Sequence, residues 1–264
     1  MIYRLPHSLQ QPLSRWWYSA VSRLDRDADM TFMNYGWADL DHGAPALALR
    51  PEDEPNRYCI QLYHRVAGAV DLHGRDVLEV GCGRGGGAAY VARALQPRTM
   101  TGLDYTRQSI EFCRRHYAAP GLSFVQGDAE ALQFPAGSFD AVVNVESSHC
   151  YGSMAKFLDG VHRVLRPGGH LLYADHRDRA NLATWRKQLA DSGLNVLAEE
   201  PINANVVRAL ELDDARKRAL IDRRVPGLLR PMFYEFAAMQ GTRSLYGTLR
   251  DGDKVYVRFV LQKT

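Results

Sequence analysis

A glycine-rich loop between an apolar strand and a helix is the part of this sequence best suited to chemistry. The loop spans Glu79 to Gly87 and reads EVGCGRGGG, directly after the apolar pair Val77 and Leu78. Glycine has no Cβ, so the backbone can turn sharply there and approach a bound ligand closely. The glycine spacing also fits the pattern of dinucleotide sites, so the loop alone predicts a nucleotide-type cofactor without choosing between two kinds.

The charge at the start of the loop decides between these cofactors. Glu79 stands at the end of the strand, shortly before the first glycine, Gly81. A carboxylate in this place opposes the anionic pyrophosphate of a nicotinamide dinucleotide, but it suits a cationic ligand. S-adenosylmethionine carries a sulfonium and an ammonium group, and we therefore expect it as the cofactor.

Polar side chains at the ends of the next strands complete a predicted cofactor site, because open α/β sheets bind ligands at the carboxyl ends of their strands. Asp104 could accept both hydrogen bonds of a ribose diol. Asp128 could accept from an adenine amino group, with the Ala129 N–H facing the ring edge. Helix capping or a solvated turn is the alternative for each acid. The expected cofactor residues are Glu79, Gly81, Gly83, Gly85, Asp104, Asp128, Ala129 and Asn144.

The elements that must position these residues alternate between strands and helices, which predicts a parallel sheet with helices on both faces. The expected strands span 77–80, 99–103, 122–126, 141–145 and 170–174, and the helices between them span 88–95, 107–116 and 154–165. We expect a helix over 180–192, a strand over 194–200, helices over 203–241 and a closing strand over 254–261, beside the strand at 170–174. The expected fold class is α/β, a doubly wound, Rossmann-like seven-stranded sheet.

The chain divides into four expected segments. Residues 1–70 form an N-terminal helical lid, 71–202 the cofactor-binding core, 203–243 a helical cap over the substrate, and 244–264 the strand that completes the sheet. We expect Tyr35 and Trp37 of the lid to cover the substrate, and Trp185 to wall its other side. The alternative is that these aromatic side chains only anchor the N-terminal segment.

Composition excludes several other classes of protein. The chain has 264 residues and a formal net charge of +3, and its basic residues alternate with acidic ones. This is no nucleic-acid footprint, and no apolar run is long enough to cross a membrane. The four cysteines form no C-x-x-C pair and no signal-peptide core is seen. We expect a cytoplasmic protein with free thiols, no metal site, no nucleic-acid partner and no stable membrane insertion, either monomer or homodimer.

Four stretches together resemble the class I S-adenosylmethionine-dependent methyltransferases: residues 77–85, 127–130, 138–140 and 165–169. A narrower resemblance lies in residues 62–65, 144–151 and 173–175, which are similar to the mycobacterial phthiotriolone and phenolphthiotriolone dimycocerosate methyltransferases. That family O-methylates a long lipid. The resemblance implies a methyltransferase of natural-product biosynthesis that acts on a lipophilic small molecule (lipid, polyketide or isoprenoid), and it leaves the acceptor open.

Two side chains after the fourth strand could serve as the base. Methyl transfer is an in-line displacement, and a hydroxyl acceptor must also lose its proton. His149 lies at the mouth of the cofactor crevice, and Asp175 at the end of the fifth strand could orient its imidazole. Glu146 is the other candidate. The expected reaction is therefore O-methylation with His149 as general base.

The alternative is C-methylation of a prenyl diphosphate alkene, with Glu146 removing the proton. It depends on a basic group in the helical cap, which could bind phosphate if it turned inward. That group consists of Arg216, Lys217, Arg218, Arg223 and Arg224. A binding protein with a decayed cofactor site and a nicotinamide-dependent oxidoreductase are further alternatives, and the intact glycine loop and Glu79 argue against them.

Overall fold

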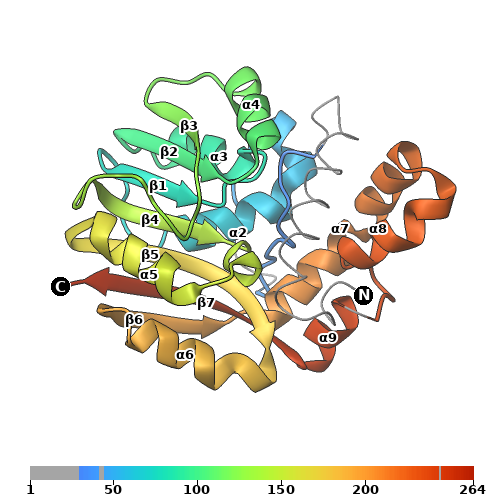
Figure 1. Cartoon of the computed structure of the whole chain (residues 1–264). Coiled ribbons are helices and arrows are strands. Elements are labelled where there is room, and N and C mark those ends of the chain that lie inside the picture. The colour runs from blue at the N-terminus through green and yellow to red at the C-terminus, as the bar shows by residue number, and fades with distance from the viewer. Residues whose placement is uncertain (1–29, 42–44, 244) are drawn as a thin grey trace.

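Seven strands form one sheet in the computed structural model, which describes residues 30–41, 45–243 and 245–264 (Figure 1). The strands are β1 (Asp76–Val80), β2 (Thr99–Asp104), β3 (Leu122–Gln126), β4 (Phe139–Val145), β5 (Leu165–Asp178), β6 (Leu194–Pro201) and β7 (Lys254–Lys263). Their order is β3-β2-β1-β4-β5-β7-β6, and β7 runs antiparallel to both of its neighbours. This confirms the doubly wound sheet and the closing strand beside β5. The order reverses between β1 and β4, where such sheets bind ligands.

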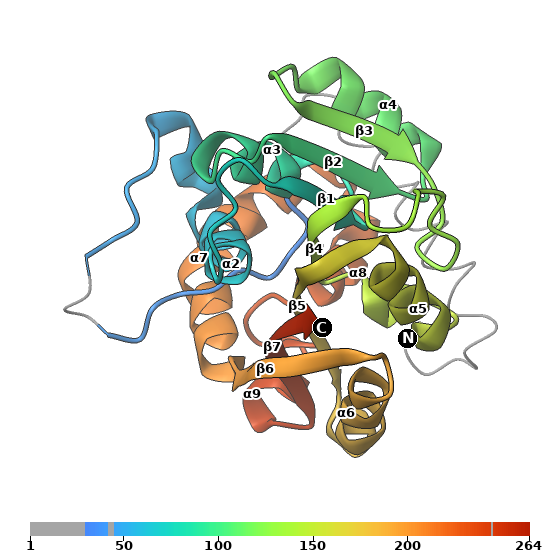
Figure 2. The same ribbon diagram turned by 90° about the vertical axis from the view of Figure 1, so that its left-hand side faces the viewer.

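Helices cover both faces of the sheet (Figure 2). One face carries α2 (Arg57–Ala67), α3 (Gly86–Ala94) and α4 (Arg107–His116), and the other carries α5 (Met154–Val164) and α6 (Leu182–Ala190). Strand β1 shows why both faces need cover, because all five of its residues are buried. Successive side chains of a strand point to opposite faces, so Val77 packs in the first layer and Leu78 in the second.

The described start of the chain is an extended strap, residues 30–41, rather than part of a helical lid. Its backbone is tied to other elements: the Trp37 N–H donates to the Tyr58 carbonyl (3.0 Å) and the Ala38 N–H to the Asn205 carbonyl (3.1 Å). At Gly36 φ is +87°, and a Cβ there would lie 2.9 Å from the Tyr58 Cβ, so the strap crosses α2 at close range. Among the described residues, the first helical elements are η2 (Pro51–Asn56) and α2. The rest of the expected lid, residues 1–29, lies outside the described residues.

The expected helical cap consists of α7 (Asn203–Arg224), η5 (Gly227–Leu229) and α8 (Arg230–Phe236). The helices break at Pro226, and Pro231 stands in the first turn of α8, where a missing N–H costs nothing. A further helix, α9 (Tyr246–Asp251), precedes β7 in the segment for which only a strand was expected. Among the described residues, no helix is both long and apolar enough to cross a lipid bilayer.

Trp185 belongs to the hydrophobic core, which corrects the prediction that it walls the substrate. The residue is 1 % exposed on α6, and its ring packs edge-on against Phe259 and Tyr173 with centroids 5.1 and 5.7 Å away. The indole N–H donates to the Tyr173 hydroxyl at 3.1 Å. A surface helix turns its large apolar side chains toward the sheet, and that requirement outweighs any role in ligand contact here.

Replacing Trp185 with alanine should lower the free energy of unfolding by about 3–5 kcal/mol, because a large void would open beside Phe259 and Tyr173. Urea unfolding followed by circular dichroism measures the loss. Trp185→Phe keeps most of the ring and should cost less. An unchanged unfolding midpoint for Trp185→Ala, together with a raised KM for the acceptor, would contradict this assignment.

Candidate active site

A cavity opens at the point where the strand order reverses. Its walls come from the glycine loop, the ends of β2 and β3, the loop after β4, and the strap. Five of the residues predicted to bind the cofactor meet in its lining, namely Gly81, Gly83, Asp104, Asp128 and Ala129.

The backbone of the glycine loop is held in a shape that side chains would not permit. At Gly81, Gly83 and Gly85 φ is +78°, +52° and +78°. The loop is fixed to the next strand, because the N–H groups of Gly81 and Cys82 both donate to the Leu103 carbonyl (2.8 and 2.9 Å). Gly85 does not line the cavity; a Cβ on it would lie 2.8 Å from the Cys113 sulfur, so it lets α3 begin close to α4.

Asp104 joins the glycine loop to β2 and lines the cavity. Its Oδ2 accepts from the Gly83 N–H (2.9 Å) and its Oδ1 from the Thr106 N–H (2.8 Å). Burial raises the pKa of Asp104, while these backbone donors stabilise its anion. Each carboxylate oxygen can accept more than one hydrogen bond, so the side chain can still receive the hydroxyls of a ribose.

Glu79 lies beneath the loop and does not itself line the cavity. Its Oε1 accepts from the hydroxyl of Tyr63 on α2 (2.6 Å), and Tyr63 does line the cavity. Its Oε2 is buried with no hydrogen-bond partner among the described residues. Burial raises the pKa of Glu79 to about 7. A buried carboxylate with one oxygen still open to a donor fits a site for a cationic, hydrogen-donating ligand such as S-adenosylmethionine.

Asn144 links β4 to β1 and to the loop after β4, and it does not line the cofactor cavity as predicted. Its Nδ2 lies 2.9 Å from the Val80 carbonyl, 2.8 Å from the Ser147 Oγ and 3.0 Å from the Tyr151 hydroxyl. Ser147 and Tyr151 line the cavity, whereas Asn144 does not. The side chain therefore positions cavity residues, because the register of β4 turns it toward β1.

Glu146 is held in a strained backbone conformation at the end of β4. Its φ is +48°, unusual for a residue with a side chain, and such residues cluster at functional sites. Its Oε1 accepts from the Tyr35 N–H of the strap (2.8 Å) and from the Tyr256 hydroxyl of β7 (2.7 Å). Burial raises the pKa of Glu146 to about 7, and the residue lines the cofactor cavity.

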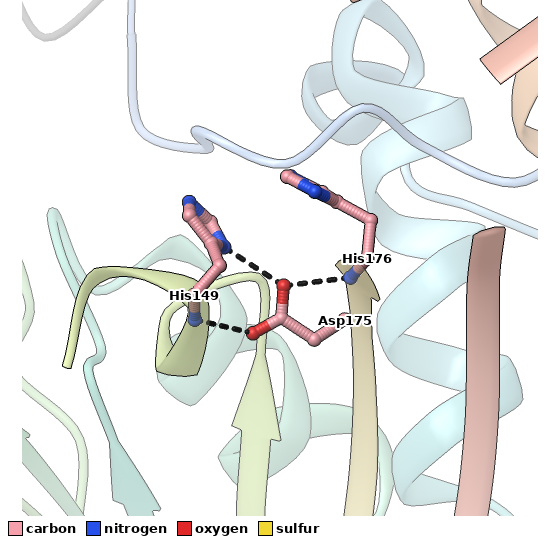
Figure 3. A group of neighbouring side chains, drawn as sticks. All are labelled: His149, Asp175 and His176. Atoms are coloured by element: carbon pink, nitrogen blue, oxygen red, sulfur yellow. Dashed lines mark hydrogen bonds and ion pairs between the residues drawn. The ribbon is translucent and has the colours of Figure 1, made fainter. Parts of the chain in front are cut away.

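His149 and Asp175 form the predicted pair, and His176 joins them (Figure 3). The His149 Nδ1 lies 2.8 Å from the Asp175 Oδ1, while the His149 backbone N–H donates to the Asp175 Oδ2 (2.9 Å). The His176 N–H donates to the Asp175 Oδ1 (2.8 Å). The two imidazoles stack with centroids 4.4 Å apart, and the His149 Nε2 is buried without a described partner.

The charges of this cluster follow from burial and pairing. Burial lowers the pKa of His149, but neighbouring Cys150 and Asp175 raise it by more, so the pKa lies well above its usual value. Burial raises the pKa of Asp175, but the cations of His149 and Arg177 hold it well below its usual value. Burial also lowers the pKa of His176 far enough to keep that ring neutral. Asp175 is thus an anion that keeps the Nδ1 of His149 protonated.

The same three side chains could be taken for a metal centre, since each offers a ligand atom and these atoms lie within 4.8 Å of one another. Both oxygens of Asp175 already accept hydrogen bonds, including one from the Ser148 hydroxyl (2.6 Å). The stacked rings of His149 and His176 lie in similar planes, 27° apart, so their nitrogen lone pairs do not converge on one point. The geometry therefore favours a hydrogen-bonded pair of His149 and Asp175 that holds a proton over a metal site.

The strap covers the cluster. The Tyr35 ring lies 5.8 Å from the His176 ring, centroid to centroid, and neither His149 nor His176 is in the lining of the cofactor cavity. Trp37, also predicted to touch the substrate, is not in that lining either; it packs on the core, with the Arg65 guanidinium 5.8 Å from its ring centre. Trp37 therefore anchors the strap, as the alternative interpretation held.

A second cavity lies beside the first, between the strap, α7 and α8. Phe32, Met33 and Asn34 line both cavities, and Tyr35 lines the second. Its walls are mainly apolar. Tyr35 was predicted from the sequence, whereas Phe32, Met33 and Asn34 were not. Tyr63 and Tyr256, the hydroxyl partners of Glu79 and Glu146, were also not predicted. The only sequence signal of these two tyrosines was a polar group within an apolar helix or strand.

Comparison with known proteins agrees with this geometry. Residues 78–173 match the methyltransferase domain family. The chain is 44 % identical over 262 residues to a fatty-acid O-methyltransferase of Mycolicibacterium smegmatis, covering 99 % of this chain and 93 % of that one. It is 43 % identical over 256 residues to the phthiotriol/phenolphthiotriol dimycocerosates methyltransferase of Mycobacterium leprae, covering 97 % and 94 %.

The fold is shared with solved methyltransferases. Geranyl diphosphate C-methyltransferase from Streptomyces coelicolor, solved with Mg²⁺, geranyl diphosphate and S-adenosyl-L-homocysteine, superposes with a TM-score of 0.71 at 17 % identity, over 99 % of both chains. The chain belongs to the S-adenosylmethionine-dependent methyltransferases, in the family of the phthiotriol dimycocerosates methyltransferases and the fatty-acid O-methyltransferase.

Proposed function

We propose that this enzyme methylates an oxygen atom of a lipophilic small molecule, with His149 as the general base when that oxygen belongs to a hydroxyl group. The observation that carries the proposal is the unpartnered Nε2 of an imidazole whose Nδ1 is bonded to the buried carboxylate of Asp175. The names of the two relatives, a fatty-acid O-methyltransferase and a phthiotriol methyltransferase, support a lipid acceptor.

His149 and Asp175 together have the groups that proton removal requires. Asp175 holds the proton on Nδ1, so a neutral His149 offers the lone pair of Nε2 to the acceptor hydroxyl. As that proton moves to Nε2, the acceptor oxygen becomes a stronger nucleophile toward the methyl carbon. S-adenosylmethionine supplies the methyl group on a sulfonium. The first cavity would hold the cofactor and the second the acceptor, which would limit the relative motion of the two reactants.

The second cavity provides the place for a lipid. Its lining includes Leu220, Ile221, Phe233 and Phe236, which suit a hydrocarbon chain. Because the strap borders both cavities, an acceptor whose chain fills the second would bring its polar end toward the first. The strap must shift to bring the acceptor to His149, which it covers.

C-methylation of a prenyl diphosphate, with Glu146 as base, remains the alternative function. Glu146 lines the cofactor cavity, and burial raises its pKa to about 7, which suits a base. Its Oε1 is, however, engaged by the strap and by Tyr256. That engagement favours a role for Glu146 in holding the strap.

Changing His149 to alanine should lower kcat for a long-chain alcohol about 10²- to 10⁴-fold, because the hydroxyl proton would have no acceptor. Transfer of labelled methyl measures the rate, and calorimetry with S-adenosylhomocysteine should show unchanged cofactor affinity. Lys187→Ala, on the exposed side of α6, is the control and should behave as wild type. A variant that keeps full activity would sink the histidine-base mechanism.

The pH profile offers a second test. A base works only when deprotonated, and the pKa of His149 lies well above 6.5, so kcat/KM for an alcohol should rise with pH through a limb above that value. Asp175→Asn removes the anion that raises this pKa, so the limb should move to lower pH while the rate falls. An unchanged limb in Asp175→Asn would assign the titration to another group.

Glu146 separates the two functions. Glu146→Gln keeps an oxygen that can accept from the Tyr35 N–H, but it removes the carboxylate base. We expect O-methylation to fall less than tenfold in Glu146→Gln, and hydrogen exchange at residues 33–37 to stay slow. Glu146→Ala should speed that exchange. Abolished activity in Glu146→Gln, with little effect of His149→Ala, would instead favour the alkene reaction.

A further inference from the structure

One face of α7 contributes cationic side chains to the lining of the apolar second cavity. Lys217, Leu220, Ile221 and Arg224 line this cavity at the spacing of a single helical face, and Arg216 lies beside them. None of the described residues in the lining is acidic. Three members of the basic group, Arg216, Lys217 and Arg224, therefore line the second cavity. From the sequence alone they could equally have belonged to a solvated helix face.

The charge of Lys217 is only partly balanced. The nearby carboxylate of Asp213 is already engaged by Arg216, whose Nε and Nη2 donate to its two oxygens at 2.6 and 2.7 Å. The Lys217 Nζ lies 3.6 Å from the same carboxylate, beyond a good hydrogen bond, and its side chain is only 14 % exposed. One carboxylate thus faces two cations in a largely apolar surrounding. An ammonium group in this setting gains from an anionic ligand.

The cations lie toward the reacting end of the second cavity. Cys59 lines this cavity, and its thiol donates to the carbonyl of Asn34 (3.5 Å), which lines both cavities. Burial raises the pKa of that thiol to about 11, and the charge of Lys217 acts in the opposite direction, so the ammonium group lies near Cys59. The cationic end of the second cavity therefore meets the cofactor cavity, while Phe233 and Phe236 wall the apolar remainder.

We propose that the second cavity binds the carboxylate head of a long-chain acid, and that Lys217 is the residue that selects the acid over a neutral lipid. The proposal rests on the proposed function, because it names the substrate class of the same site. A long-chain acid matches this lining in two ways. Its charged head suits the cations, and its hydrocarbon chain suits the apolar walls.

The chemistry of an acid acceptor also balances without a base. A carboxylate oxygen supplies the electron pair of the new bond to the methyl carbon, and the pair of the breaking carbon–sulfur bond stays on sulfur. The products are a neutral methyl ester and a neutral thioether. Methylation thereby removes the charge that Lys217 binds, so the ester should leave more easily than the acid that entered.

The test compares lauric acid, lauryl alcohol and methyl laurate below their micellar concentrations. Binding is measured by calorimetry to the full chain saturated with S-adenosylhomocysteine, so no chemistry is required. The acid should bind about tenfold or more tightly than the alcohol or the ester. Lys217→Met, which keeps the apolar stem, should remove most of that preference without weakening alcohol binding, and Lys217→Arg should retain it.

Matched variants separate a specific contact from general charge. Arg223→Met removes an exposed cation of the same helix, outside the described lining, and should leave all three affinities unchanged. Lys217→Gln repeats the test should Lys217→Met unfold, as thermal unfolding would reveal.

Three results would overturn the proposal. They are equal binding of acid and alcohol by the wild type, an equal loss of both in the Lys217 variants, and tighter binding of geranyl diphosphate than of lauric acid. Failure of the proposed function looks different: neither lipid would accept labelled methyl, whatever the binding measurements give.

Discussion

The buried carboxylate of Asp175 is the interaction on which the reacting end of this site depends. It collects hydrogen bonds from the loop after β4, through His149 and Ser148, and from its own strand, through the His176 N–H. An anion can remain buried only when donors and cations compensate for lost water, and here both are present. The same contacts that make the charge tolerable fix the imidazole of His149, so stability and positioning have one cause.

The cofactor half of the site follows from local sequence, and this is why it could be predicted. The glycines need their backbone angles whatever surrounds them, and Asp104 and Asp128 stand at strand ends whose order is set by the alternating pattern. The acceptor half depends on contacts between distant segments. The hydrogen bond between Tyr35 and Glu146 joins residues 111 positions apart, and no residue pattern in either stretch predicts it.

Individual errors have the same origin. Trp185 and Trp37 are aromatic residues near the site in sequence, yet packing directs the first into the core and the second onto the Arg65 side of α2. Asn144 was expected at the cofactor because it ends a strand, but the register of β4 turns it toward Val80. Polar and aromatic residue types indicate that a site is near. Which way each side chain points is decided by tertiary structure.

The strap separates the two cavities and lines both of them. Phe32, Met33 and Asn34 border the cofactor cavity on one side and the apolar cavity on the other. A ligand that orders this wall from one side removes part of the conformational entropy that a ligand on the other side would otherwise lose. A ligand in one cavity that changes the order of this shared segment would change the affinity of the other cavity, and such a linkage would be reciprocal between cofactor and lipid.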